Sequence, residues 1–401
     1  MEEGHHSSLP PSRVIYARFL RAALEDDWKT AEAFIQENPN CLAAPITKQE
    51  GTALHNAAGA KRTRFVKELV KLMTLEQLEL RNNRNCTALF YAAQSEIVTI
   101  AEVMVKKNIN LPLIPRNDIQ CLPLYAAIKT GNRDMVSYLY SVTPIQVLAS
   151  AHRVELLKAT ISTDLYDTAL KILDTTLDDL RSGEKELLWE PLEMLARKPS
   201  EIIGNKSQPS LWERCLNSCF RGRLCNKALM QASAHRLVDC LWEKLGDDDK
   251  RFSPTAVDEQ HMMKLLVEAT EVGNLEFLVI LIRSYPDLIW QVDKEYGSLF
   301  HVAVKHRQER LFNLIYEIGV SYGYLVTFCT KEENSLLHLA GQLPSPDRLN
   351  IVSGAALQMQ RELLWFQVRT NGASFFLSLS LESAIVRFSL CIPHTKRGLS
   401  M

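Results

Sequence analysis

The chain has 401 residues, of which 46% are hydrophobic and 23% are charged. Its formal net charge of −1 provides no basic footprint, so we exclude nucleic acid as a partner. The nine cysteines are scattered and odd in number, which argues against a disulfide framework and favours a reducing, cytoplasmic location.

The first residues, 1–12, are polar and contain no apolar segment of the kind found in secretory signals, so we expect a disordered tail. Two runs with helical periodicity follow between residues 13 and 38, and they predict a helix pair that caps an array of repeats.

A large apolar residue followed three positions later by a residue that is usually small recurs along the chain with gaps of 33 to 37 residues. We call these the repeat pairs: Leu20/Ala23, Leu54/Ala57, Leu89/Ala92, Leu124/Ala127, Leu157/Thr160, Leu192/Leu195, Leu229/Ala232, Leu266/Ala269, Phe300/Ala303 and Leu337/Ala340. So steady a period is typical of stacked supersecondary units, and we predict that each pair lies on the first helix of a unit.

The residues around five of the pairs are closely similar. Residues 52–58, 87–93, 122–128, 298–304 and 335–341 read Thr-Ala-Leu-His-Asn-Ala-Ala, Thr-Ala-Leu-Phe-Tyr-Ala-Ala, Leu-Pro-Leu-Tyr-Ala-Ala-Ile, Ser-Leu-Phe-His-Val-Ala-Val and Ser-Leu-Leu-His-Leu-Ala-Gly. They resemble the Thr-Pro-Leu-His-x-Ala signature of ankyrin repeats. Threonine or serine suits a helix N-cap, Pro123 and Pro191 suit a first helical turn, and alanine lets paired helices approach closely.

Second helices are predicted after the first ones, because apolar residues recur there at helical spacing. They are Phe65, Val66, Leu69, Val70 and Met73, and later Leu311, Phe312, Leu314, Ile315 and Ile318. Gly131 and Gly273 stand where the chain must turn between the two helices. The predicted fold is an all-α ankyrin-repeat solenoid, elongated, with short β-hairpin tips between repeats.

The pattern also predicts domain boundaries. A first block of repeats covers 13–197, and residues 198–225, with several Pro, Gly, Asn and Ser, are predicted to be a loop or insertion. A second block covers 226–345 and a helical remnant covers 346–367.

The sequence contains no catalytic motif that we can identify, so we predict no enzymatic activity and no cofactor. Cys215, Cys219 and Cys225 form the tightest group of cysteines, and His235 follows them. Their spacing lacks the Cys-x2-Cys pattern of zinc sites, and we interpret the cysteines as free thiols. His55, His301 and His338 are separated by whole repeats, so we expect each to form hydrogen bonds in its own repeat.

One cluster of positive charge lies on a predicted second helix and consists of Lys61, Arg62, Arg64, Lys67 and Lys71. We interpret it as a solvated helix face, and the alternative is a site for an acidic partner or an anionic lipid.

Three stretches resemble a narrower family, the plant ankyrin-repeat proteins with a C-terminal PGG domain. They are residues 192–200 (Leu-Glu-Met-Leu-Ala-Arg-Lys-Pro-Ser), 300–319 and 348–367. The resemblance implies a cytosolic ankyrin region followed by membrane-spanning helices, with roles in defence, cell death and salt stress. It also implies a location at the cytosolic face of the plasma membrane.

After Gln367 the sequence departs from that family. Residues 368–401 contain Glu382, Arg387 and several serines among apolar residues, which is too polar for a membrane span. Two interpretations stay open: a genuine end of an isoform, or translated intron sequence, because Gln367-Val368-Arg369 can be encoded by a splice-donor consensus. We therefore expect membrane contact only through a missing PGG domain or weakly through this tail.

Ankyrin arrays present their tips and the concave face of their first helices side by side, so we expect other proteins to bind there. Among the tip residues we predict Arg81, Arg84, Arg116 and Tyr296 as partner-binding residues, because arginine and tyrosine are enriched in binding hot spots. The predicted function is a protein-binding adaptor in plant stress or defence signalling. The alternative is the cytosolic regulatory domain of a membrane-anchored, channel-like PGG-domain protein, and the oligomeric state stays open.

Overall fold

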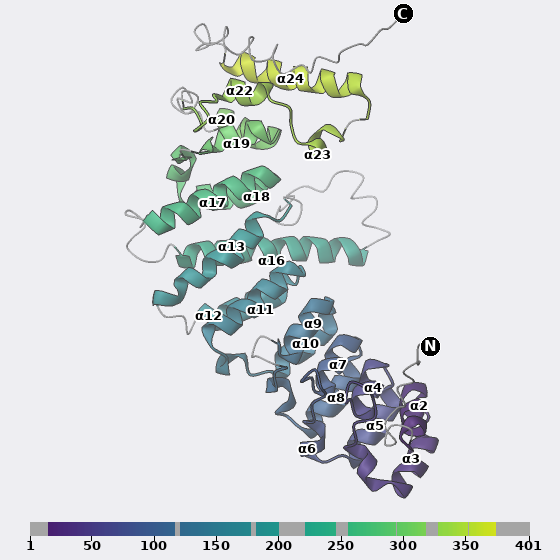
Figure 1. Cartoon of the computed structure of the whole chain (residues 1–401). Coiled ribbons are helices and arrows are strands. Elements are labelled where there is room, and N and C mark those ends of the chain that lie inside the picture. Colours follow the sequence, from purple (N-terminus) through teal and green to yellow (C-terminus); the bar gives the residue numbers. More distant parts are fainter. Residues whose placement is uncertain are drawn as a thin grey trace, which may run out of the picture. The chain divides into compact units, whose positions relative to one another are not determined.

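The computed structural model describes residues 15–116, 121–177, 182–199, 221–245, 256–293, 295–317, 328–351 and 353–373 (Figure 1). The chain divides into two compact units, residues 1–187 and residues 188–401, which we call unit 1 and unit 2.

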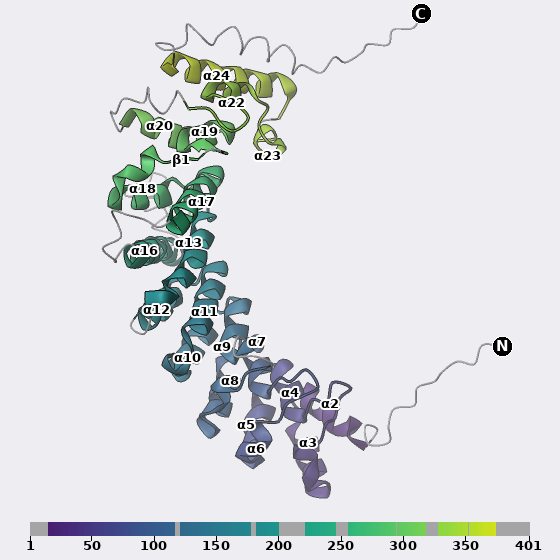
Figure 2. The same cartoon turned by 60° about the vertical axis from the view of Figure 1, so that its left-hand side comes forward.

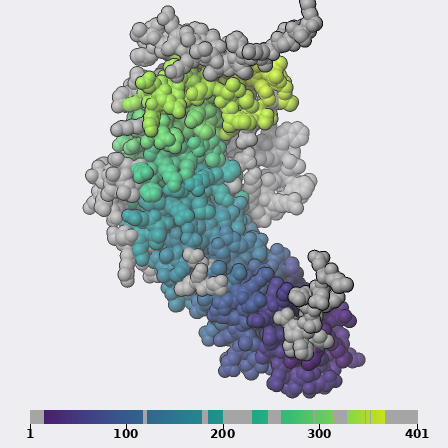
Figure 3. Space-filling model, in the orientation of Figure 1, coloured from purple at the N-terminus to yellow at the C-terminus, as the bar shows by residue number. Residues whose placement is uncertain are grey.

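Unit 1 is built from helix pairs. They are α2 (Ala17–Glu25) with α3 (Trp28–Glu37), α4 (Ala53–Gly59) with α5 (Thr63–Leu72), α7 (Ala88–Ser95) with α8 (Val98–Lys107), α9 (Pro123–Thr130) with α10 (Arg133–Val142), and α11 (Ser150–Ser162) with α12 (Tyr166–Leu177). Between them lie α6 (Leu75–Leu78) and the short 3₁₀ helices Pro39–Leu42, Leu111–Leu113 and Ile145–Val147. The first helices α2, α4, α7, α9 and α11 pack on one another in this order, and α5 packs against α3 and α8. In the space-filling view the coloured atoms of successive repeats touch (Figure 3).

The repeat pairs form the centre of this stack. Leu54, Ala57, Leu89 and Ala92 are at most 1% exposed. Because alanine has no bulk beyond Cβ, neighbouring first helices can approach closely, and each leucine then fills the space between them. The second-helix residues Phe65, Val66, Leu69, Val70 and Met73 are buried as predicted.

The turn between the two helices has the same backbone conformation in several repeats, but the residue type at the turn differs. Gly131 and Gly273 have φ of 74° and 85°, as the prediction of glycine turns required. At the equivalent place other repeats have a left-handed residue that is not glycine: Asp26, Lys61, Glu96, Asp164 and Arg307, with φ between 57° and 68°. The prediction was therefore too narrow, because the stack holds side-chain-bearing residues in this conformation as well.

Unit 2 contains a second series of helices. They are α13 (Trp189–Ala196), α16 (Arg221–Leu245), α17 (Ala256–Val272), α18 (Leu275–Ser284), α19 (Leu299–Lys305), α20 (Glu309–Glu317), α22 (Leu336–Gly341), α23 (Pro346–Leu349) and α24 (Ala355–Ala373). The 3₁₀ helix Pro286–Trp290 precedes a two-stranded antiparallel hairpin of β1 (Val292–Asp293) and β2 (Gly297–Ser298), in which Val292 lies opposite Ser298. First helices α13, α17, α19 and α22 pack in this order, and α24 packs on α22. Figure 2 shows second helices α16, α18 and α20 on one side of these first helices.

The prediction that Leu229/Ala232 marks a first helix is wrong. Helix α16, which contains this pair, packs beside α13 and against α18, while α13 packs directly on α17. Ala232 is exposed, whereas the repeat-pair residues Ala269 and Ala303 are fully buried. The helix α16 is therefore the second helix of the repeat that α13 begins, and residue 226, the predicted start of the second block, lies within it. The prediction failed because a leucine three positions before an alanine can also occur by chance on a second helix.

Candidate partner-binding surfaces

The tips between repeats are tight turns, and in several of them one side chain forms a hydrogen bond that stabilises the turn. At four described tips a side-chain oxygen of the first turn residue accepts a hydrogen bond from a backbone N–H three or four residues later. The pairs are Thr47 Oγ1 with Gly51 at 3.0 Å, Asn82 Oδ1 with Cys86 at 3.0 Å, Asp293 Oδ1 with Tyr296 at 3.0 Å and Thr330 Oγ1 with Asn334 at 3.3 Å. Such Asx- and ST-type bonds favour turns over helix or sheet. Strand geometry occurs at the β1–β2 tip, and elsewhere in the described chain the predicted β-hairpins are turns without strands.

Asn82 holds the second tip of unit 1 together. Its side chain also accepts from the Arg84 backbone N–H at 3.0 Å and donates to the Tyr91 hydroxyl at 2.8 Å, and it is only 7% exposed. Its backbone N–H donates to the Cys86 carbonyl at 3.0 Å. The tip is therefore a rigid platform attached to the first helix α7.

Three of the four predicted binding residues lie together at this tip and the next one. The side chains of Arg81 and Asn85 both donate to the backbone carbonyl of Arg116, Arg81 at 3.4 Å. In return, Arg116 Nε donates to the Arg84 carbonyl at 3.2 Å, and its guanidinium lies 5.8 Å from the centre of the Phe90 ring. Residues 117–120 of the third tip lie outside the described part of the chain.

Tyr296, the fourth predicted residue, belongs to the β1–β2 tip of unit 2 and is 40% exposed. Its tip carries acidic side chains, and the neighbouring carboxylate of Glu295 raises the pKa of the Tyr296 hydroxyl. At the next described tip, Glu332 accepts from the Asn334 side chain at 3.0 Å. These two tips of unit 2 thus carry more acidic than basic side chains, whereas the second tip of unit 1, with Arg81 and Arg84, is basic.

Two of the signature histidines, His55 and His301, connect their first helix to the backbone of the following repeat. The backbone N–H of Thr52 donates to Nδ1 of His55 at 3.2 Å, so Nε2 carries the ring proton and donates to the Cys86 carbonyl at 3.0 Å. His301 repeats this arrangement in unit 2, with Ser298 at 3.2 Å and Phe328 at 2.9 Å. The predicted local hydrogen bonds of these histidines are confirmed, and the rings additionally bridge to the next repeat. Burial lowers the pKa of both histidines, because the charged ring would lose its hydration.

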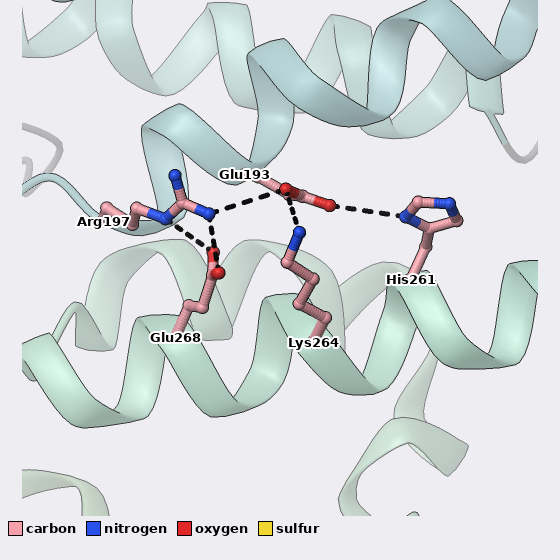
Figure 4. A network of polar contacts seen from close by, with 5 residues as sticks. All are labelled: Glu193, Arg197, His261, Lys264 and Glu268. Carbon is pink, nitrogen blue, oxygen red and sulfur yellow. Dashed lines mark hydrogen bonds and ion pairs between the residues drawn. The ribbon is translucent and has the colours of Figure 1, made fainter.

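A polar network joins the first helices α13 and α17 of unit 2 (Figure 4). The Glu193 carboxylate, whose side chain is 7% exposed, accepts from Lys264 Nζ at 2.6 Å and lies 3.3 Å from His261 Nδ1 and 3.6 Å from Arg197. Arg197 forms a two-pronged pair with Glu268 at 2.7 and 3.0 Å. The network therefore ties two first helices that are about seventy residues apart in sequence.

Sequence reasoning missed this network. Glu193 comes one position after the repeat residue Leu192, and Lys264 two positions before Leu266, so opposite charges stand at facing positions of two adjacent first helices. That signal can be read only when α13 and α17 are known to be neighbours. The wrong assignment of the Leu229/Ala232 pair had placed another first helix between them.

The basic cluster predicted on the second helix lies along α5 and the turn before it. Lys61 pairs with Glu96 at 3.6 Å and Lys71 with Glu68 at 2.8 Å, while Arg64 and Lys67 are exposed. Arg62 Nε donates to the Leu24 carbonyl at 2.5 Å. These contacts agree with the interpretation of a solvated face.

Metal-ligating side chains do not gather in groups of three within the described residues. Cys215 and Cys219 lie outside those residues, and so does the side chain of Cys225. No helix among the described residues is long and apolar enough to cross a bilayer.

Comparison with known proteins agrees with the geometry. Residues 19–115 match the family model of ankyrin repeats, in three copies. No curated protein matches the chain. Together with the stacked helix pairs, this match shows that the predicted fold class, an all-α ankyrin solenoid, is correct. Ankyrin repeats are protein–protein interaction modules and are generally not enzymes.

Proposed function

We propose that this chain is a non-enzymatic scaffold that binds other proteins through its tips and the exposed face of its first helices, as an adaptor in plant stress or defence signalling. The observation that carries the proposal is the pair of tips with Arg81, Arg84 and Arg116, which is held rigid by hydrogen bonds between repeats. Arg81 and Arg84 are exposed, and the half-buried Arg116 lies over the buried Phe90 ring; ordered arginines beside an aromatic ring have the composition of binding hot spots. The signalling role is supported by the resemblance of residues 192–200, 300–319 and 348–367 to the PGG-domain family.

A second candidate function is that of a cytosolic regulatory domain in a membrane-anchored or channel-like protein. The resemblance of residues 348–367 favours it, because the family continues from there into a PGG domain. On this alternative the plasma membrane would be reached through the membrane-spanning helices of a PGG domain. The partner surfaces proposed above would be the same.

The test uses lysine crosslinking of the full chain to captured partners, read out by mass spectrometry. Lys48 lies at a tip and Lys129 on a first helix, whereas Lys67 and Lys106 lie on second helices, and all four are exposed. We expect partner crosslinks at Lys48 and Lys129. Crosslinks that concentrate on Lys67 and Lys106 would refute the proposed binding surfaces.

A further inference from the structure

The arginines at the tips of unit 1 carry positive charge that no described carboxylate neutralises. The ion pairs of described residues in unit 1 involve other side chains, such as Lys61 with Glu96. Arg81, Arg84 and Arg116 nevertheless lie on two adjoining tips that are bonded to each other. Like charges so close together repel, and an anionic ligand would relieve this repulsion.

The hydrogen-bond donors of this cluster are largely unused. Within the described chain the Arg84 side chain donates to no residue, Arg81 uses only Nη1, and Arg116 uses only Nε. A guanidinium offers five N–H donors in a planar fork that matches a carboxylate. The cluster can therefore form several two-pronged bonds to carboxylates without giving up its present contacts.

Contacts within the chain already hold the Arg116 side chain in place. Its guanidinium lies over the Phe90 ring at 5.8 Å while Nε is bonded to the Arg84 carbonyl, and Phe90 itself is only 9% exposed. A side chain that is already ordered loses little entropy on binding. The neighbouring tip is also ordered, since the Asn83 backbone N–H donates to the Gln49 carbonyl at 3.0 Å.

The charges around the cluster limit the kind of anion. The first tip contributes Lys48 and Glu50, whose charges cancel, and the Glu79 carboxylate accepts from Asn108 at 2.8 Å. Three cations on two tips suit two or three carboxylates of a short segment. They are too few for a nucleic acid backbone, whose binding requires a basic stripe.

We propose that the tips of unit 1 bind an acidic peptide segment of a partner protein, with Asp or Glu side chains paired to Arg81, Arg84 and Arg116. This inference rests on the protein-binding function proposed above and adds the chemistry of the partner. The carboxylates lie in the forks of the arginines, and the ordered tip backbone holds these forks in place.

The experiment measures binding of a fluorescent peptide, in which aspartate alternates with glycine, to the full chain by anisotropy. An uncharged twin peptide has asparagine at every aspartate. The test variant is Arg81→Gln with Arg84→Gln, which leaves the backbone carbonyl that receives the Arg116 bond. The matched control is Arg64→Gln with Lys67→Gln, which removes the same charge from exposed positions on α5 of the same unit.

We expect the aspartate peptide to bind, the asparagine peptide not to bind, and added salt to weaken binding. The test variant should weaken binding about tenfold, as the loss of two exposed ion pairs implies, and the control less than about twofold. Equal weakening by both variants would overturn the proposal, since attraction would then come from the overall charge of unit 1. Binding to phosphatidylserine vesicles without peptide binding would also overturn it, in favour of a membrane.

The two proposals can fail separately. If the aspartate peptide does not bind but captured proteins still crosslink to Lys48, the acidic partner is refuted and the scaffold function stands. If crosslinks avoid the tips and the first helices altogether, the scaffold surfaces are refuted as well.

Discussion

Unit 1 and unit 2 share the same helix-pair architecture but use their charged side chains differently. In unit 2 several cations form ion pairs between packed helices: Lys264 and Arg197 with Glu193 and Glu268, and the buried Arg307 with Glu362 at 2.9 Å. In unit 1 the first helices α2, α4, α7 and α9 bury apolar or uncharged side chains, and the tip arginines have no carboxylate partner among the described residues. The same type of repeat can therefore use charged side chains to hold helices together or leave them available for a partner.

The largest expected effect comes from placing a charge in the apolar core of unit 1. Leu89 is completely buried, so Leu89→Asp would place a carboxylate where water cannot reach it. We expect a loss of more than about 4 kcal/mol and unfolding of the neighbouring repeats. Hydrogen exchange read by mass spectrometry should show lost protection in unit 1 and retained protection in unit 2, because repeats interact mainly with their neighbours.

The control for that experiment is Arg84→Gln, which changes an exposed side chain at the tip and should alter the free energy of unfolding by less than about 0.5 kcal/mol. Equal destabilisation by the two variants would contradict the surface position of Arg84.

The next largest effect concerns the buried cation of unit 2. The Arg307 side chain is 3% exposed and donates to Glu362, to the Val304 carbonyl at 2.9 Å and to the Gln342 carbonyl at 2.5 Å. Arg307→Ala should cost about 2–4 kcal/mol, because it leaves these acceptors without a partner. Urea unfolding measures the change, and exchange at α24 should rise. Arg310→Ala, an exposed neighbour, should have little effect, and equal losses would show that Arg307 does not anchor α24.

A smaller effect is expected from the network in Figure 4. Glu193→Gln removes the charge that faces Lys264 and Arg197, whose side chains are 46% and 52% exposed. Because solvent screens these partners, we expect a loss of only about 1–2 kcal/mol. The midpoint of thermal unfolding reports it, with Glu243→Gln on exposed α16 surface as the control. An unchanged midpoint for Glu193→Gln would mean that the network contributes nothing to cohesion.

The smallest expected effect is the pH dependence that both units share. Burial lowers the pKa of His55, His301 and His306 below the ordinary value of 6.5. Between these lowered pKa values and about pH 6.5 the unfolded chain binds more protons than the folded one. The contribution of these histidines to stability is therefore constant well above pH 6.5, falls as the pH drops from about 6.5 toward the folded-state pKa values, and levels off below them. Urea midpoints between pH 8 and pH 5 measure this. His55→Gln should reduce the slope, and a slope unchanged by this variant would exclude His55 as a contributor.

Much of the fold could be predicted because its signals are local. The position of the first helices follows from the N-cap residues Thr52, Thr87, Ser298 and Ser335, each of which precedes a helix in the structure. A cap and an apolar period act within one or two turns of chain, so they can be read without knowledge of neighbours. The prediction failed at Leu229/Ala232 for the same reason, because this pair has the spacing of the repeat by chance and a local pattern cannot show which helices are neighbours.

The candidate site was predicted in part. Arginine at successive tips is visible in the sequence, yet only the structure shows that Arg116 lies over Phe90 and that the tips exchange hydrogen bonds through the carbonyls of Arg84 and Arg116. These contacts join residues more than thirty positions apart, and local helix or turn propensities say nothing about such contacts. Tyr296 could be chosen for its residue type, and the carboxylates of Asp293 and Glu295 beside it are visible in the sequence, whereas the proximity of Glu271 required the structure.

By itself, the sequence determined the repeat length, the helix pairs and the tips, because these depend on short-range capping, periodicity and turn chemistry. Only the tertiary structure decided which helices are neighbours: α13 packs on α17, and α16 takes the place of a second helix. That choice depends on which apolar faces fit together across a long connection, and it also brings Glu193 to Lys264 and Arg197. The physical reason is that side-chain packing and buried charge pairing act between segments, whereas the sequence code for helices acts within them.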